Sequence, residues 1–302
     1  MSREQREAVN KMLGRPRSSD GVPIEKLRAG FADMMAKMRV ADGIKTSETT
    51  LGSRRALHVE PAAGDSAGTI LYFHGGSYRL GSPETAMSLT SALVVRTQMQ
   101  SYSLDYRLAP EHPYPAAFED TLAAYRELLS RGIDPMSVAF AGDSAGGGLA
   151  IGTCFAVRDA NLPMPAAVVT FSAGLDATRT GESMDAKDGV DPFFTKAGLQ
   201  KSNEGYLAGQ DPLQPMLSPA LVGDLTGFPP LLLQVGTNEL LLDDTTRLAR
   251  RAWDANVDVI LDVTANVPHV FQAFTGILDE ADHALDRAAQ FLRQHRPRDG
   301  RC

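Results

Sequence analysis

The sequence has few cysteines, no excess of positive charge and no long uninterrupted apolar run, and each shortage excludes a class of protein. Its 302 residues include only two cysteines, Cys154 and Cys302, too few for the disulfide framework of a small secreted domain. The net charge of −7 disfavours nucleic acid and anionic membrane surfaces as partners. No apolar stretch approaches the ~20 residues that cross a bilayer, and the charged N-terminus lacks the apolar core of a signal peptide. We therefore expect a reduced, soluble, cytoplasmic protein without a membrane partner.

Segments typical of strands and helices alternate along most of the chain. A hydrophobic content of 43% and a charged content of 22% are those of an ordinary globular protein. Almost wholly apolar runs predict strands buried on both faces, at residues 68–73, 138–141, 166–171 and 231–235. Helical patterns lie between them, so the sequence predicts an α/β fold with a mostly parallel sheet and helices on both faces.

The N-terminal segment, residues 1–45, departs from this alternation and is expected to form helices. Its apolar positions recur at helical spacing and include Met34, Met35 and Met38. Such a methionine-rich stripe suits either core packing or an adaptable surface over a binding site.

A second departure spans residues 172–228, which are rich in glycine, proline, aspartate and serine. One helical stretch is expected at 195–208. The segment is too long for a simple crossover, so we expect an insertion that packs over the active end of the sheet. The core of a single catalytic domain then comprises residues 46–171 and 229–302.

A Gly-x-Ser-x-Gly motif at 142–146 lies between the apolar run at 138–141 and a helical run rich in alanine and glycine. In this strand–turn–helix context the motif is typical of a nucleophile elbow, which lifts Ser144 clear of the sheet on a strained turn. Gly142, Ala145 and Gly146 leave room for that turn. A phosphate-binding or merely structural turn would look similar, so the chain must also supply a base, an acid and an oxyanion hole.

A serine hydroxyl is a weak nucleophile until a positioned base removes its proton. The last predicted strand spans residues 257–263. Of the six histidines, His269 lies in a loop directly after this strand, where such a base is expected. The acid is expected after the strand at 231–235. There, Asp243 and Asp244 are explained as cap and dipole partners of a helix, whereas Glu239 has no such role. We therefore favour Glu239 as the acid and keep Asp243 as the alternative.

An oxyanion hole needs backbone N–H groups aimed at the developing negative charge. His74-Gly75-Gly76 follows a buried strand, the position expected for such a segment when Ser144 is the nucleophile. The sequence predicts donors from Gly75, Gly76 and Ala145.

With these residues in place, the chain resembles the bacterial hormone-sensitive-lipase group of α/β-hydrolase esterases over about residues 45–296. The resemblance rests on His74-Gly75-Gly76, Gly142-Asp143-Ser144-Ala145-Gly146-Gly147, Gly236-Thr237-Asn238-Glu239, Pro268-His269-Val270-Phe271 and the run DYRLAPEHPYPA at 105–116. It implies an α/β-hydrolase fold whose cap is formed by residues 1–45 and 172–228. It also implies a carboxylesterase without cofactor or metal, which hydrolyses short-chain acyl esters through a Ser144–His269–Glu239 triad and an acyl-enzyme.

Substrate contacts are expected mainly around the oxyanion segment, the insertion and the His269 loop, at Ser77, Tyr78, Leu80, Tyr206, Leu207, Val270 and Phe271. Two departures from the family pattern accompany them. Ser77 stands where many relatives have a third glycine, and Glu239-Leu240-Leu241 stands where many have Asp-Pro-Leu. Within the run at 105–116, we expect Arg107 and Glu111 to pair. The resemblance further implies a homodimer formed through the last strand and its helix.

Two other functions stay open on the sequence. The same triad also cleaves amides, carbamates and aryl formamides, so the bond type is a hypothesis. Some receptors that resemble this family bind a small ligand and have lost the base. Because His269 is present, the sequence favours an enzyme.

Overall fold

The computed structural model describes residues 2–14, 21–64 and 66–296, which fold around an eight-stranded sheet of order β1-β2-β4-β3-β5-β6-β7-β8. The strands are β1 (Ile44–Leu51), β2 (Arg54–Pro61), β3 (Thr69–Phe73), β4 (Gln100–Leu104), β5 (Val138–Asp143), β6 (Ala167–Phe171), β7 (Leu231–Gly236) and β8 (Val259–Thr264). β2 runs antiparallel to both its neighbours, and the other neighbouring strands are parallel.

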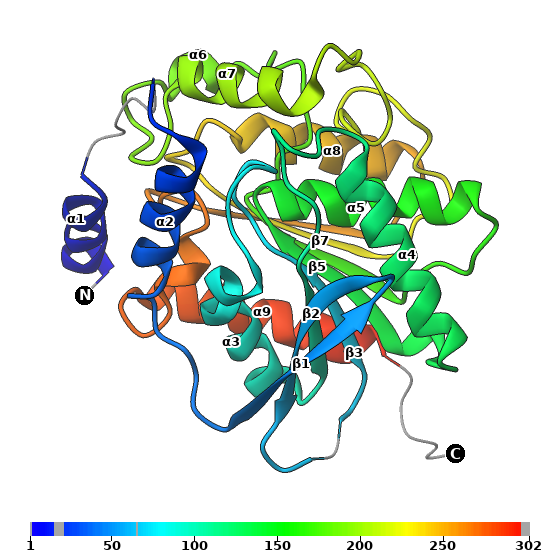
Figure 1. Ribbon diagram of the computed structural model, residues 1–302. Helices are drawn as coiled ribbons and strands as arrows, with labels where there is room; N and C mark the ends of the chain where they lie inside the picture. The colour runs from blue at the N-terminus through cyan, green and yellow to red at the C-terminus, as the bar shows by residue number, and fades with distance from the viewer. Residues whose placement is uncertain (1, 15–20, 65, 297–302) are drawn as a thin grey trace.

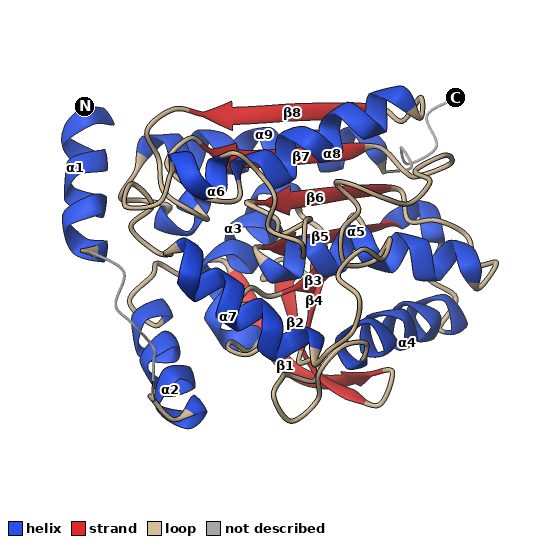
Figure 2. Ribbon diagram, turned by 90° about the horizontal axis from the view of Figure 1, so that it is seen from above, coloured by secondary structure: helices blue, strands red, loops and turns tan. Residues whose placement is uncertain are grey.

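Helices cover both faces of this sheet (Figure 2). One face carries α4 (Ala116–Ser130), α5 (Ala145–Asp159) and α8 (Leu242–Asp254), and the other carries α3 (Met87–Thr97) and α9 (Asp279–His295). Short 3₁₀ helices lie at η1 (Pro83–Ala86), η2 (Pro135–Ser137) and η3 (Phe271–Phe274). Every residue of β3, β5, β6 and β7 is buried, which explains why these strands are continuous apolar runs. The predicted α/β-hydrolase architecture is confirmed.

The parallel strands bring their carboxyl ends to one edge of the sheet, where ligands bind in open α/β folds. Two peripheral segments lie beside that edge (Figure 1). The N-terminal one contains α1 (Ser2–Leu13) and α2 (Ile24–Met35), and the other contains α6 (Ser183–Ala186) and α7 (Lys196–Leu207). Within the described residues, no helix combines the length and the apolar character needed to cross a bilayer.

The α2 helix has no buried residue, and a polar anchor fastens it to the core. The Arg28 guanidinium donates to both carboxylate oxygens of Glu111, at 2.7 and 2.6 Å. It also donates to the carbonyl oxygens of Arg79 and Ala109, at 2.9 and 3.1 Å. One arginine therefore ties α2 to two loops of the core.

This anchor corrects the predicted pairing of Arg107 with Glu111. Arg107 instead donates to Glu119 and Asp120, at 2.8 and 2.9 Å, because the first turn of α4 brings both carboxylates beside it. Glu111 is left for Arg28, a partner 83 residues away that spacing along the chain does not indicate.

The sequence also missed an individual strand. β1 has the polar sequence IKTSETTL, without an apolar run, because it is an outer strand whose side chains are mostly exposed. Because β1 pairs along the outer side of β2, His58 lies on the second strand of the sheet, where its ring stacks on Tyr102 with the two centroids 4.5 Å apart.

Candidate active site

The turn between β5 and α5 holds Ser144 in a conformation that side chains rarely adopt, with φ 52° and ψ −119°. Glycines on either side make it possible, because a Cβ at Gly146 would overlap the Phe73 carbonyl oxygen. A Cβ at Gly142 would similarly overlap the Gly146 carbonyl oxygen. The motif thus forms the strained strand–turn–helix elbow that its spacing predicts.

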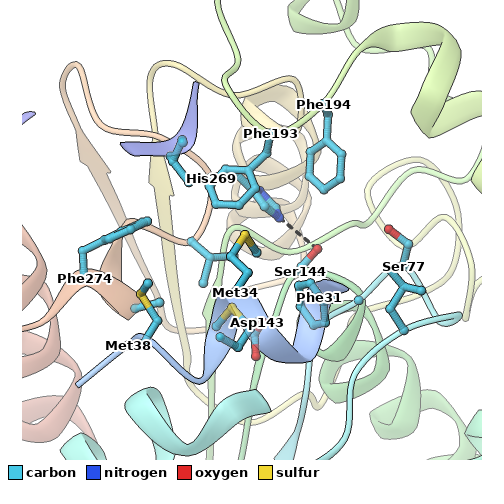
Figure 3. A pocket seen from close by; sticks show the side chains of 16 residues that line it. Phe31, Met34, Met38, Ser77, Asp143, Ser144, Phe193, Phe194, His269 and Phe274 are labelled. Atoms are coloured by element: carbon cyan, nitrogen blue, oxygen red, sulfur yellow. Dashed lines mark hydrogen bonds between the residues drawn. The ribbon is translucent and has the colours of Figure 1, made fainter. Parts of the chain in front are cut away.

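Ser144 is the first member of a chain of buried hydrogen bonds. Its Oγ lies 2.9 Å from His269 Nε2, drawn as a dashed line in Figure 3, and His269 Nδ1 lies 2.7 Å from Glu239 Oε2. An ionised carboxylate only accepts hydrogen bonds, so Nδ1 carries the proton and Nε2 is free to accept from the serine hydroxyl. All three side chains are almost fully buried.

Glu239 is held by two further donors. Its Oε1 accepts from the Ser172 hydroxyl at 2.9 Å and from the Gly236 N–H at 2.5 Å. Ser172 also accepts from the Val270 N–H at 3.0 Å, which ties the acid to the histidine loop. Sequence reasoning missed Ser172, which follows β6 without a motif of its own.

The other acid candidates have different partners. Asp243 Oδ2 accepts from the Ser183 N–H at 2.8 Å. Asp244 Oδ2 accepts from the N–H groups of Leu175 and Asp176, at 2.7 and 3.0 Å. Both carboxylates therefore fasten the segment after β6 to the start of α8.

The charges around His269 favour the protonated form of its imidazole. Burial on its own lowers the pKa of His269, but the hydrogen bond and charge of Glu239 outweigh it and leave this pKa above its ordinary value. Asp191 and Asp143 add smaller contributions in the same direction. Burial also raises the pKa of Asp143 to about 6, although the Tyr72 hydroxyl, 2.8 Å away, favours its ionised form.

Among the predicted oxyanion donors, Gly75 lies against a buried carboxylate. Its N–H is directed at the Asp143 carboxylate, and a Cβ at this position would overlap that carboxylate. Gly76 and Ser77 are the residues of this turn that border the cavity next to Ser144, and their N–H groups have no acceptor among the described residues. The turn has positive φ values at Gly76, Ser77 and Tyr78.

A cavity of about 220 Å³ opens beside Ser144 and His269 (Figure 3). Apart from these two and Asp143, its wall is mostly apolar: Leu13, Phe31, Met34, Met35, Met38, Gly76, Ser77, Leu80, Phe193, Phe194, Val270, Ala273 and Phe274. Of the expected contacts, Ser77, Leu80 and Val270 line this cavity. The methionine stripe of α2 and the segment after it lines it too, whereas Leu13, Phe193, Phe194, Ala273 and Phe274 were not anticipated.

Four of the expected contacts do not line this cavity: Tyr78 borders a smaller cavity described below, and the other three are buried. Tyr206 and Leu207 are buried at the end of α7, where Tyr206 stacks on Tyr78 at 3.9 Å. Phe271 is fully buried in an apolar cluster beneath the His269 loop. Each lies one layer behind the surface that a substrate would meet, a distinction that burial decides and proximity in sequence does not.

A second, much smaller cavity of about 20 Å³ also borders Ser144. Tyr78, Ala145, Gly174, Leu199 and Leu241 are among the residues that line it. His269 lines only the larger of these two cavities. Over the described part of the chain, no cluster of three or more His, Cys, Asp or Glu side chains is arranged to hold a metal ion.

Comparison with known proteins agrees with this geometry. Residues 70–273 match the model of an alpha/beta hydrolase fold family. The chain belongs to that family. It is 44% identical to an acetyl-hydrolase of Streptomyces hygroscopicus over 244 residues, which cover 81% of each chain.

Solved structures narrow the family further. The chain superposes with a TM-score of 0.91 on an esterase from the bacterial hormone-sensitive lipase family, at 38% identity, with 97% of this chain and 98% of the other covered. A structure of the esterase EstE5, soaked with p-nitrophenyl butyrate, also gives a TM-score of 0.91, at 36% identity and 96% and 98% coverage. This α/β hydrolase is therefore an esterase of the hormone-sensitive-lipase type, a serine carboxylic-ester hydrolase.

Proposed function

We propose that this hydrolase cleaves short-chain acyl esters through an acyl-enzyme formed on Ser144. The observation that carries the proposal is the pair of contacts at His269, 2.9 Å from Ser144 Oγ and 2.7 Å from Glu239 Oε2. A nucleophile, a base and an orienting acid in this order are the requirements for activating a serine hydroxyl.

The reaction follows from the protonation states. Ser144 Oγ attacks the ester carbonyl carbon while its proton moves to His269 Nε2, and Glu239 stabilises the imidazolium. The tetrahedral oxyanion accepts hydrogen bonds from the N–H groups of Gly76, Ser77 and Ala145. His269 then returns the proton to the leaving alcohol oxygen as the carbon–oxygen bond breaks. A water molecule, deprotonated by His269, then attacks the carbonyl carbon of the Ser144 ester. The bond from that carbon to Oγ breaks as His269 returns the proton to Ser144 Oγ, and the carboxylic acid is released.

The two cavities support a short acyl group. The leaving oxygen must lie near His269 to receive its proton, so the alcohol portion extends into the larger cavity, which His269 lines. The acyl chain then enters the smaller cavity, which also borders Ser144 and offers about 20 Å³. A single water needs roughly 10–15 Å³ on such a scale, so that space suits an acetyl or propionyl chain.

The test is a series of p-nitrophenyl esters from acetate to decanoate, with wild type and Ser144→Ala. A matched control is Ser130→Ala, which removes an exposed hydroxyl at the end of α4. We expect hydrolysis to be fastest for the shortest chains and to fall by about 10³-fold or more in Ser144→Ala alone. Unchanged turnover in Ser144→Ala would refute the mechanism, and a rate maximum at long chains would refute the assignment of the smaller cavity.

Two further assays distinguish an esterase from an amide hydrolase and from a ligand-binding receptor. A p-nitroanilide with the same acyl group reports amide hydrolysis, and we expect it to be a much poorer substrate than the ester. A fluorophosphonate should label wild type and leave Ser144→Ala unlabelled. Tight binding of a small ligand without labelling would instead favour a receptor.

A further inference from the structure

One carboxylate of the insertion is buried beside the site. Asp191 lies between α6 and α7 and is 1% exposed. Its Oδ1 accepts from the N–H groups of Phe193 and Phe194, at 2.7 and 3.1 Å, and its Oδ2 accepts from the Leu240 N–H at 2.9 Å. Asp191 thus joins the insertion to the residue that follows Glu239 in the chain.

Both phenylalanines fixed by Asp191 approach His269. Their rings stand at 70° to the imidazole, with centroids 6.0 Å away for Phe193 and 4.9 Å away for Phe194. Figure 3 shows the two rings above the Ser144–His269 hydrogen bond, and both line the larger cavity. A short turn with Asp191 at its base therefore determines where these two rings lie.

We infer that Asp191 is a positioning residue of the esterase: it fastens the insertion to the Glu239 loop and adds a second negative charge facing His269. The inference rests on the proposed role of His269 as the base. Glu239 orients the imidazole by direct contact, and Asp191 acts through the Leu240 N–H, the two phenylalanines and its charge. No sequence motif indicated this residue.

The charges that face His269 have one sign. The carboxylates of Glu239, Asp191 and Asp143 approach it from the β7–α8 loop, the insertion and the end of β5, and each favours the imidazolium. Three N–H donors stabilise the ionised form of Asp191, while burial raises its pKa above the ordinary value. Loss of this charge should therefore lower the pKa of His269 and leave it neutral at more acidic pH.

The experiment compares wild type, Asp191→Asn and Asp191→Ser. The two variants remove the charge but leave an acceptor oxygen for the turn. Asp185→Asn is the matched control, because Asp185 belongs to the same insertion and is largely exposed. Two readouts are measured: the midpoint of the His269 titration by NMR, assigned with His269→Asn, and the acid limb of kcat/KM.

We expect the titration midpoint of wild type to lie above the ordinary 6.5. In both Asp191 variants it should fall by about one unit, at the low end of what a nearby opposite charge produces, while Asp185→Asn leaves it unchanged. The acid limb of kcat/KM should move by the same amount in the same direction. A purely structural role would lower kcat or stability without moving either midpoint.

A wild-type midpoint at or below 6.5, or variants that titrate within about 0.2 units of wild type, would overturn the inference. The wild-type measurement keeps it testable even where a variant does not fold. The NMR titration is independent of turnover. An enzyme that fails to hydrolyse esters would therefore refute the proposed function and leave the effect of Asp191 on His269 measurable.

Discussion

Replacing Glu239 by glutamine tests the orientation of His269 with almost no change in shape. The Glu239→Gln side chain keeps the volume and loses the charge. The new amide oxygen must occupy the Oε1 position, since the Gly236 N–H, 2.5 Å away, can only donate. The amide nitrogen then takes the place of Oε2, the atom that in the wild-type protein accepts the Nδ1 proton of His269 at 2.7 Å.

This exchange forces the imidazole into the wrong tautomer. The amide N–H donates to Nδ1, so Nδ1 must be unprotonated and the neutral ring carries its proton on Nε2. Nε2 then directs this proton at Ser144 and cannot accept the proton of the serine hydroxyl. The alternative, a flipped amide, would set two donors against each other at Gly236 and cost about 1–3 kcal/mol. The corresponding change in a serine protease lowers kcat about 10⁴-fold, equivalent to about 5 kcal/mol of transition-state stabilisation.

We therefore expect Glu239→Gln to lose about 10⁴ in kcat for p-nitrophenyl acetate while its thermal unfolding midpoint stays close to that of wild type. Glu239→Asp is the matched control. It keeps the charge, withdraws it by one methylene, and should remain within about 10²-fold of wild type. A folded Glu239→Gln enzyme that retains more than about a tenth of the wild-type kcat would refute the role of Glu239.

Three further predictions concern packing, pH and the anchor of α2. Gly146→Ala places a methyl group on a backbone oxygen of β3 and should lower the free energy of unfolding by several kcal/mol. Gly205→Ala, in the interior of α7, would bring its methyl only into ordinary contact with Arg79 Nε, 4.0 Å away, and should change this free energy by about 1 kcal/mol or less; urea denaturation compares the two variants. Because the pKa of His269 is raised, kcat/KM should reach half its plateau above pH 6.5 and decline below it, and a midpoint under 6.5 in a pH profile would contradict this. Arg28→Met should loosen α2 and raise KM for apolar esters several-fold with little change in kcat, and Lys26→Met, on the same helix, should leave both unchanged in steady-state assays.

Local sequence was sufficient for the residues whose chemistry depends on spacing along the chain. The elbow at 142–146 needs small residues within four positions, and this requirement is visible without a fold. The order of strands placed His269 after β8 and Glu239 after β7, where the structure finds them within hydrogen-bond distance of one another. Strands buried on both faces were equally clear, because they leave continuous apolar runs.

Contacts between distant segments were decided by the tertiary structure alone. Arg28 binds Glu111, 83 positions away in the sequence, and Asp191 accepts a hydrogen bond from Leu240, 49 positions away. No local sequence pattern predicts either contact. The oxyanion turn shows the same limit at short range. Its glycines were visible, but only the structure shows that Gly75 lies against a buried carboxylate of the neighbouring strand, whereas Gly76 and Ser77 border the cavity.

The substrate cavity shows most clearly which features the sequence predicts and which depend on the tertiary structure. The sequence indicated apolar residues near the site, including Phe271 and Met34, yet one is buried beneath the cavity and the other lines it. Which side chains face a cavity depends on how helices from opposite ends of the chain pack around it. The identity of the reacting groups was therefore written in the sequence, whereas the shape of the space in which they act was set by packing between segments.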